Sequence, residues 1–207
     1  MRLVLARHGA TPHNETGLLT GQIDAPLTEL GERQAEALAH RLATWRFDAI
    51  IASDLTRARR TAEAVARYHE QPVEIEPRLR EIDMGSCAGK PFADWSEAER
   101  LQFHTMQSDP AGHVPAPGGE SFAAVAERIE QALNHARERY PGGTVLWVTH
   151  GGVISALLCR ALDLGFDHRQ QFSRANCALF ELTYHDDRTV IVRLNDTGHL
   201  EALATQS

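Results

Sequence analysis

Two apolar segments that lie far apart in the chain end in the same way: residues 3–9 read LVLARHG, and residues 145–152 read VLWVTHGG. Short, continuously apolar runs are typical of strands buried on both faces of a parallel sheet. Ligands of open α/β sheets bind beyond the carboxyl ends of the strands, so we expect His8 and His150 to meet at one site. The glycines that follow them, including Gly151, allow the backbone to approach a ligand closely.

Strand and helix patterns alternate along most of the chain. Further apolar runs predict strands at residues 48–53 and 73–76. Apolar spacing and capping residues predict helices at residues 28–45, 57–68, 91–106, 121–139 and 153–162. This alternation predicts an α/β fold: a three-layer α/β/α sandwich whose mainly parallel sheet carries an antiparallel edge strand.

Three stretches fall outside this alternation. Residues 9–27 are rich in Gly, Pro, Asn and Asp, which predicts a long loop, and long loops in compact domains are usually functional. Residues 177–184 and 189–194 alternate on either side of a polar turn, which predicts a terminal hairpin. We expect one domain over residues 1–207, in which residues 91–119 form a helix and loop inserted over the active site.

Composition limits the partners that this chain can have. Its net charge of −7 leaves no basic excess to neutralise the phosphates of a nucleic acid. No apolar stretch approaches the roughly 18 residues of a membrane span, and the first apolar run is too short for a signal peptide. We therefore expect a cytoplasmic protein with no membrane partner. The widely spaced cysteines Cys87, Cys159 and Cys177 predict neither a disulfide framework nor a zinc site.

The two strand-end histidines have two candidate cationic partners. Arg7 directly precedes His8, and Arg57 lies at the junction of the second predicted strand with the following helix. Two guanidinium groups near two imidazoles suit a tetrahedral dianion, because arginine matches phosphate oxygens in a bidentate manner. Burying His8 and His150 at strand ends without a role would also be costly. These residues therefore predict a phosphate site.

Other phosphate and metal chemistries fit the sequence less well. None of the three cysteines has an arginine six residues later, as a cysteine-dependent phosphatase needs, and no GxSxG or GxGxxG motif occurs. The segment from Gly85 to Lys90 is one residue too short for a phosphate-binding loop. His8, His13 and His150 could form a metal site, but the nearby arginines would repel a divalent cation. We therefore expect no metal and no other cofactor.

Five motifs and a C-terminal segment together resemble one known family. They are RHGATPHNETGLLTGQIDAPLTELGERQA at 7–35, SDLTRARRTAEAVA at 53–66, LREIDMG at 79–85, PGGES at 117–121, VTHGGV at 148–153 and LNDTGHL at 194–200. This ordered set resembles the histidine phosphatase superfamily, which includes the cofactor-dependent phosphoglycerate mutases. The resemblance covers nearly the whole chain, and it implies phosphoryl transfer through a phosphohistidine.

The resemblance also implies a role for individual residues. His8 would be the nucleophile that is phosphorylated on Nε2, and Glu81 would protonate the leaving group and later activate water. Arg7, Arg57 and His150 would hold the phosphoryl oxygens. The remaining substrate-binding residues would be Asn14, Thr20, Gly21, Gln22 and Gly151.

Two departures from the family pattern bear on the substrate. Residues 86–89 read SCAG and lack the Trp and Glu that often follow the catalytic Glu, which predicts a smaller and less polar rim near Cys87. Mutases of the family carry a sequence similar to ERHYG at the catalytic Glu. Ile82 and Met84 stand where that sequence has Arg and Tyr. The segment 86–116 also holds a single Lys and a single Arg, whereas mutases of the family carry a longer basic insertion.

These departures favour a hydrolase of phosphomonoesters that acts on a small phosphorylated metabolite, either with broad specificity or as an α-ribazole-phosphate phosphatase. A cofactor-dependent phosphoglycerate mutase and a phosphate-binding module with weak or no turnover are the alternatives. The sequence leaves both a monomer and a homodimer open.

Overall fold

The computed structural model describes residues 1–204 and contains a six-stranded mixed sheet in the order β3-β2-β4-β1-β5-β6. Its strands are β1 (Arg2–Arg7), β2 (Ala49–Ala52), β3 (Val73–Ile75), β4 (Thr144–Thr149), β5 (Leu179–Tyr184) and β6 (Thr189–Asp196). The first four strands run parallel, whereas β5 and β6 form an antiparallel hairpin beside β1. The predicted α/β fold, with a mainly parallel sheet and an antiparallel edge, is confirmed.

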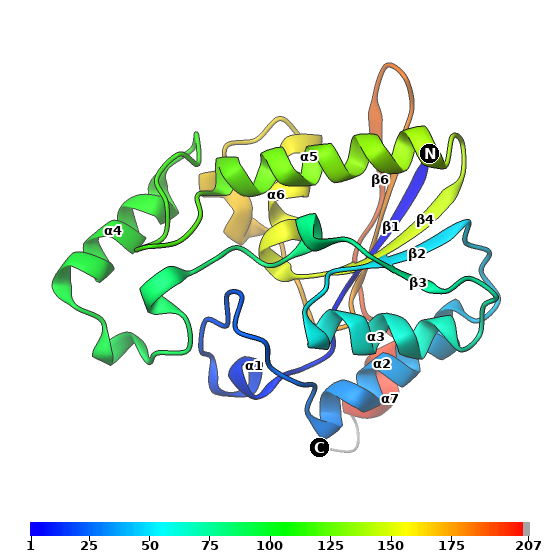
Figure 1. The fold of residues 1–207 in the computed structure, drawn as a ribbon, viewed down its shortest axis with the longest axis horizontal. Coiled ribbons are helices and arrows are strands. Elements are labelled where there is room, and N and C mark those ends of the chain that lie inside the picture. The colour runs from blue at the N-terminus through cyan, green and yellow to red at the C-terminus, as the bar shows by residue number, and fades with distance from the viewer. Residues whose placement is uncertain (205–207) are drawn as a thin grey trace.

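Helices cover both faces of this sheet. The helices of the described residues are α1 (Pro12–Thr16), α2 (Glu29–Leu42), α3 (Thr56–Ala66), α4 (Glu97–Ser108), α5 (Phe122–Arg139), α6 (Gly151–Ala161) and α7 (Glu201–Ala204), and not all of them pack on the sheet. In Figure 1, α2 and α3 lie on one side of the sheet, and α5 and α6 lie on the other. No helix within residues 1–204 is long and apolar enough to cross a membrane.

Strand β1 supplies side chains to both hydrophobic cores. Leu3 and Leu5 join the core shared with α5 and α6, whereas Val4 and Ala6 join the core shared with α2 and α3. Successive side chains of a strand point to opposite faces of the sheet, so a strand covered on both sides is apolar throughout. This placement explains the continuous apolar run in the sequence.

The segment between β3 and α5 departs from the predicted helix at residues 91–106. Helix α4 begins only at Glu97, because the side chain of Ser96 accepts a hydrogen bond from the backbone N–H of Glu99 and caps the helix there. The helix then continues to Ser108. In Figure 1, α4 stands apart from both helix layers, at the left of the view.

The register of the central strands brings the two His-Gly sequences together. In the parallel pair β1 and β4, Arg7 lies opposite Thr149, so His8 and His150 leave the sheet side by side. The backbone N–H of His8 donates to the carbonyl of Thr149 at 2.9 Å. The neighbouring strand β2 ends at the same level, where Ser53 begins the turn into α3. Three strand ends therefore converge on one point.

Candidate active site

His8 is fixed in the tautomer that leaves Nε2 unprotonated. Its ring lies 5.1 Å from the ring of His150 between centroids, and both residues are buried. The Nδ1 atom of His8 lies 2.7 Å from the carbonyl oxygen of Gly9. Because a carbonyl can only accept a hydrogen bond, Nδ1 must carry the proton, and the lone pair of Nε2 stays available.

Both histidines are held in the neutral form. Burial lowers the pKa of His8 well below its usual 6.5, and the charges of Arg7 and Arg57 lower that pKa further. Burial also lowers the pKa of His150 well below its usual value, with Arg57 as the next largest cause. A neutral imidazole can attack phosphorus, whereas an imidazolium cannot, so the surroundings of His8 favour its nucleophilic form.

Three buried nitrogen atoms in and around these imidazoles have no hydrogen-bond partner. They are Nε of Arg7, Nε of Arg57 and Nδ1 of His150, none of which is paired within residues 1–204. The Nε2 atom of His150 lies 2.9 Å from the hydroxyl of Ser53, which orients the ring. Buried polar groups are rarely left unpaired, because each costs about 1–3 kcal/mol. A phosphoryl group would supply acceptors for the two arginine N–H groups.

The two arginines are locked in place by backbone carbonyls. Arg57 is fully buried and donates to the carbonyls of Gly21 and Ile23, at 2.8 and 2.7 Å. Arg7 donates to the carbonyl of Arg174. A Cβ atom at Gly151 would lie 3.7 Å from the Nε atom of Arg7, so this arginine packs against the first turn of α6. The N-terminus of α6 and two guanidinium groups therefore favour an anion at one place.

Glu81 is held at the same helix N-terminus. Its Oε1 atom accepts the backbone N–H groups of Ile82 and Gly152, at 2.9 and 3.0 Å, and its Oε2 atom lies 3.1 Å from the same Gly152 nitrogen. A Cβ atom at Gly152 would lie only 2.3 Å from Oε1, so a larger residue at this position would displace the Glu81 carboxylate. The carboxyl group keeps free lone pairs on Oε2, through which it can exchange a proton with a ligand.

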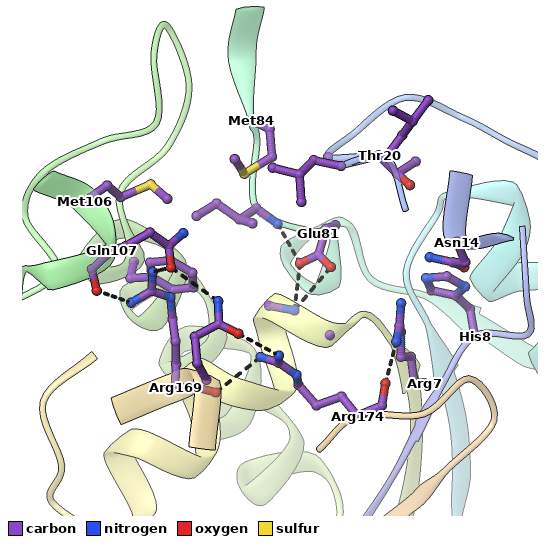
Figure 2. Close-up of a pocket in the computed structure, with 18 of the residues that line it drawn as sticks. Arg7, His8, Asn14, Thr20, Glu81, Met84, Met106, Gln107, Arg169 and Arg174 are labelled. Carbon is purple, nitrogen blue, oxygen red and sulfur yellow. Dashed lines mark hydrogen bonds between the residues drawn. The ribbon is translucent and has the colours of Figure 1, made fainter. Parts of the chain in front are cut away.

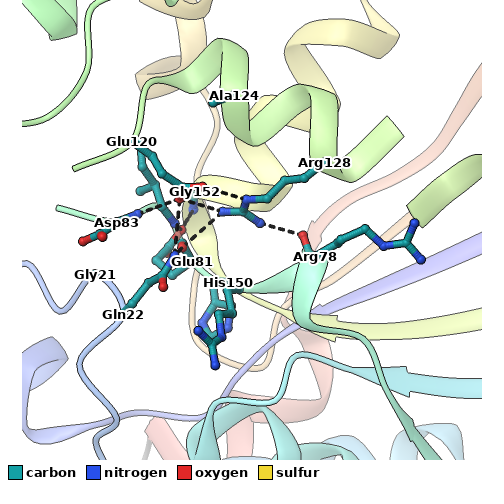
Figure 3. Close-up of polar contacts among 12 residues, drawn as sticks. Gly21, Gln22, Arg78, Glu81, Asp83, Glu120, Ala124, Arg128, His150 and Gly152 are labelled. Atoms are coloured by element: carbon teal, nitrogen blue, oxygen red, sulfur yellow. Dashed lines mark hydrogen bonds and ion pairs between the residues drawn. The ribbon is translucent and has the colours of Figure 1, made fainter. Parts of the chain in front are cut away.

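A network of side chains supports the backbone of Glu81 (Figure 3). Arg128 donates to both carboxylate oxygens of Glu120 and to the carbonyl of Glu81. The amide of Gln22 donates to the same carbonyl at 3.1 Å. Gln22, predicted to bind substrate, is thus placed behind Glu81 and does not line the cavity. Arg128 and Glu120 were not predicted as site residues, although Glu120 lies in the PGGES motif.

These groups open into a cavity of about 220 Å³ (Figure 2). Of the predicted site residues, those that line it are Arg7, His8, Asn14, Thr20, Gly21, Arg57, Glu81 and Gly151. His150 is fully buried and is not among the residues that line the cavity. Asn14 is oriented by Asn176, whose amide donates to its Oδ1 at 3.1 Å. The structure therefore brings together most residues that the sequence singled out.

The sequence singled out no individual side chain of the far wall of the cavity, although it predicted that residues 91–119 lie over the active site. This wall comprises Phe103, Met106 and Gln107 of α4, Phe122 of α5, and Arg169, Gln170 and Arg174 from the connection between α6 and β5. That connection carries no motif that could have marked it. Ile82 and Met84 also line the cavity, whereas Cys87 is fully buried elsewhere. The apolar character of this wall thus comes from α4 and α5 as well as from the segment after Glu81.

Because buried His8 and His150 are neutral, we predict that the free energy of unfolding decreases in mild acid. In the unfolded chain both imidazoles take up protons below about pH 6.5, whereas burial delays this in the folded chain. The unfolded state then binds more protons, so the free energy of unfolding should decrease as the pH falls below about 6.5, by up to about 1.4 kcal/mol per pH unit for each histidine. Above that pH the two groups should contribute no pH dependence.

Urea unfolding between pH 7.5 and 5.5 would measure this slope. His8→Asn should make it shallower, whereas His185→Asn, at an exposed position after β5, should leave it unchanged. Equal slopes in the two variants would contradict the conclusion that burial of neutral His8 causes the pH dependence of stability.

The geometry of the site defines a class of protein, namely one in which a neutral, buried histidine lies beside an anion-binding pocket. Residues 3–197 match the histidine phosphatase superfamily (branch 1). The chain is 35% identical over 210 residues to a probable phosphoglycerate mutase GpmB of Cronobacter sakazakii, covering 99% of this chain and 97% of that protein. It therefore belongs to the histidine phosphatase superfamily.

Solved structures of other proteins share the whole fold. A mycobacterial glucosyl-3-phosphoglycerate phosphatase, determined with VO3, is 31% identical with a TM-score of 0.84, over 95% of this chain and 99% of that one. A putative alpha-ribazole-5'-P phosphatase from Escherichia coli is 29% identical with a TM-score of 0.84, over 95% and 96% of the two chains. The chain is thus similar both to proteins named as phosphatases and to proteins named as mutases.

Proposed function

We propose that this enzyme is a metal-independent hydrolase of small phosphomonoesters that works through a phosphohistidine at His8. The observation that carries this proposal is the pair of unpaired buried N–H donors on Arg7 and Arg57 beside the neutral imidazole of His8. A phosphoryl transition state spreads negative charge over its equatorial oxygens, so fixed donors at those positions lower the barrier.

The reaction divides into two steps. In the first, the Nε2 lone pair of His8 attacks phosphorus, the P–O ester bond breaks, and Glu81 gives a proton to the departing alkoxide. In the second, the Glu81 carboxylate takes a proton from water as the water oxygen attacks the phosphohistidine. The P–N bond then breaks, inorganic phosphate leaves, and both residues return to their starting forms.

We also assign residues 91–119 to an insertion that covers the leaving-group side of this site. Phe103, Met106 and Gln107 of α4 line the cavity. Figure 2 shows Met106 and Gln107 across Glu81 from His8, on the side that an ester substituent would occupy. Insertions of this kind set specificity, because the phosphoryl end of the site is common to every substrate.

A phosphoglycerate mutase is the second candidate, because a relative carries that name. A mutase must keep its phosphoenzyme intermediate away from water while the bound glycerate reorients. Ile82 and Met84 offer no hydrogen-bond donor from their side chains to help hold that intermediate complex. We therefore expect water, rather than the bound glycerate, to accept the phosphoryl group.

The two reactions are separated by offering 3-phosphoglycerate with a bisphosphoglycerate primer. Release of inorganic phosphate without efficient formation of 2-phosphoglycerate is the expected result. Rapid formation of 2-phosphoglycerate would show that the enzyme is a mutase. Absence of phosphate release from every ester in a screen of phosphorylated metabolites would instead favour a binding module without turnover.

Activity should survive exhaustive treatment with EDTA. The positive charge that the transition state needs comes from Arg7, Arg57 and the N-terminus of α6. Within residues 1–204, no group of three or more His, Cys, Asp or Glu side chains is arranged to hold a metal ion. The measurement is the rate of phosphate release before and after dialysis against EDTA. Loss of activity that one divalent metal restores would overturn the metal-free mechanism.

A further inference from the structure

Arg174 reaches the cavity from a segment that carries none of the motifs. Its Nη1 donates to the hydroxyl of Ser155 in α6 and, at 3.2 Å, to the carbonyl of Arg169. Its Nη2 donates to the side chain of Gln170 at 3.2 Å. The guanidinium is therefore held in one orientation by three partners before any ligand arrives.

Part of this guanidinium remains available to a ligand. Arginine has five N–H donors, and the hydrogen bonds within residues 1–204 occupy three of those of Arg174. The Nε–H and one N–H of Nη2 are left over, and Arg174 lines the cavity. Desolvation by burial lowers the pKa of Arg174, while the nearby carboxyl group of Glu81 raises it. A second anion in the cavity would add favourable interactions with this cation.

Arg174 lies on the leaving-group side of Glu81. A Cβ atom at Gly151 would lie 3.9 Å from the Cδ atom of Arg174, which places this side chain beside the first turn of α6 and next to the residue that binds Glu81. In Figure 2, Glu81 lies between His8 on one side and Met106 and Gln107 on the other. A substituent on the ester carbon, close to the oxygen that Glu81 protonates, would therefore come within reach of Arg174.

The other arginine of this wall is already committed. Arg169 is fully buried, and its guanidinium donates to Gln107 and to the carbonyl of Phe166 while lying 4.3 Å above the ring of Phe122. The rest of the wall is largely apolar. A single guanidinium with two free N–H groups matches a carboxylate, whereas a second phosphate dianion would need more donors than this wall offers.

We propose that Arg174 is a specificity residue that binds a carboxylate of the leaving group, so that the enzyme prefers phosphomonoesters of small hydroxy acids over uncharged esters of the same size. This inference rests on the proposed hydrolase function and names its substrate class. Arg174 can hold the carboxylate of the substrate while the reaction remains hydrolysis, because Ile82 and Met84 offer no side-chain donor to hold the intermediate complex of a mutase.

The test compares 3-phosphoglycerate with glycerol 3-phosphate, which carries a hydroxymethyl group in place of the carboxylate. The wild-type enzyme should have the higher kcat/KM for the acid. Arg174→Ala should lower the ratio of the two kcat/KM values by about tenfold to a hundredfold, as expected when a charge-assisted hydrogen bond is lost. Arg174→Lys should recover part of that ratio. Arg188→Ala, at an exposed position in the β5–β6 hairpin, should not change it.

An unchanged ratio would overturn the proposal, and equal losses on both esters would mean that Arg174 only supports Arg7. A binding measurement keeps the test independent of turnover and of the folding of one variant. In a His8→Ala background, calorimetry should show tighter binding of 3-phosphoglycerate than of glycerol 3-phosphate, and Arg174→Lys should reduce that difference. If the wild-type enzyme releases phosphate from no ester in the metabolite screen but this difference holds, the hydrolase assignment fails and the carboxylate site stands.

Discussion

Replacing His8 with alanine should lower turnover by at least about a thousandfold, because the reaction loses its nucleophile and not merely a contact. The same variant should form no acid-labile phosphoenzyme. The structure supplies the reason: the Nδ1 atom of His8 is occupied by the Gly9 carbonyl, and burial keeps Nε2 unprotonated.

Rapid quenching with a ³²P-labelled ester, followed by exposure of the trapped protein to acid, measures the intermediate. Substitution at His185, an exposed position, serves as the control and should leave both the label and the turnover intact. Trapping of labelled phosphate on the His8→Ala protein would show that another residue is the nucleophile.

Replacing Glu81 with glutamine should slow the phosphorylation step, and the loss of rate should be larger for esters with more basic leaving groups. An alkyl phosphate departs as a basic alkoxide and needs a proton in the transition state, so its phosphorylation step should slow by roughly a hundredfold to ten-thousandfold. A nitrophenyl phosphate departs as a stable anion and should lose less than about tenfold in the same step.

Single-turnover and burst kinetics are needed for this comparison, because in the proposed mechanism Glu81 also activates water in the second step and overall turnover can fall for both esters. Asp83→Asn is the matched control. Asp83 is another nearby carboxylate, but its side chain accepts the backbone N–H of Gly85 at 2.8 Å and does not line the cavity. Equal losses on the two esters in Glu81→Gln would assign the proton donor to another residue.

Arg174 shows why part of the site could not be predicted. It lies 167 residues from Arg7 along the chain, yet its carbonyl accepts the Arg7 guanidinium. No periodicity or motif relates the two positions, because the contact arises only when the segment between α6 and β5 folds over the first turn of α6. The roles of Gln107 and Phe122 in the wall depend in the same way on how α4 and α5 pack.

Gln22 illustrates the opposite case. The sequence marked it as a member of a motif, but its side chain supports the backbone of Glu81 together with Arg128 and does not enter the cavity. Membership of a motif identifies a residue near the chemistry. Whether the side chain faces the ligand or the back of a catalytic residue depends on local backbone direction, which the motif does not encode.

The sequence by itself determined the α/β class, the parallel centre of the sheet and the meeting of His8 with His150. These follow from local patterns: strand runs that are apolar on both faces, and the rule that parallel strands present their carboxyl ends at one edge. Only the tertiary structure decided which donors are left unpaired around His8, and which side chains face the leaving group. Both depend on contacts between segments that are distant in the chain, and such contacts are set by packing and burial rather than by the order of residues within any one segment.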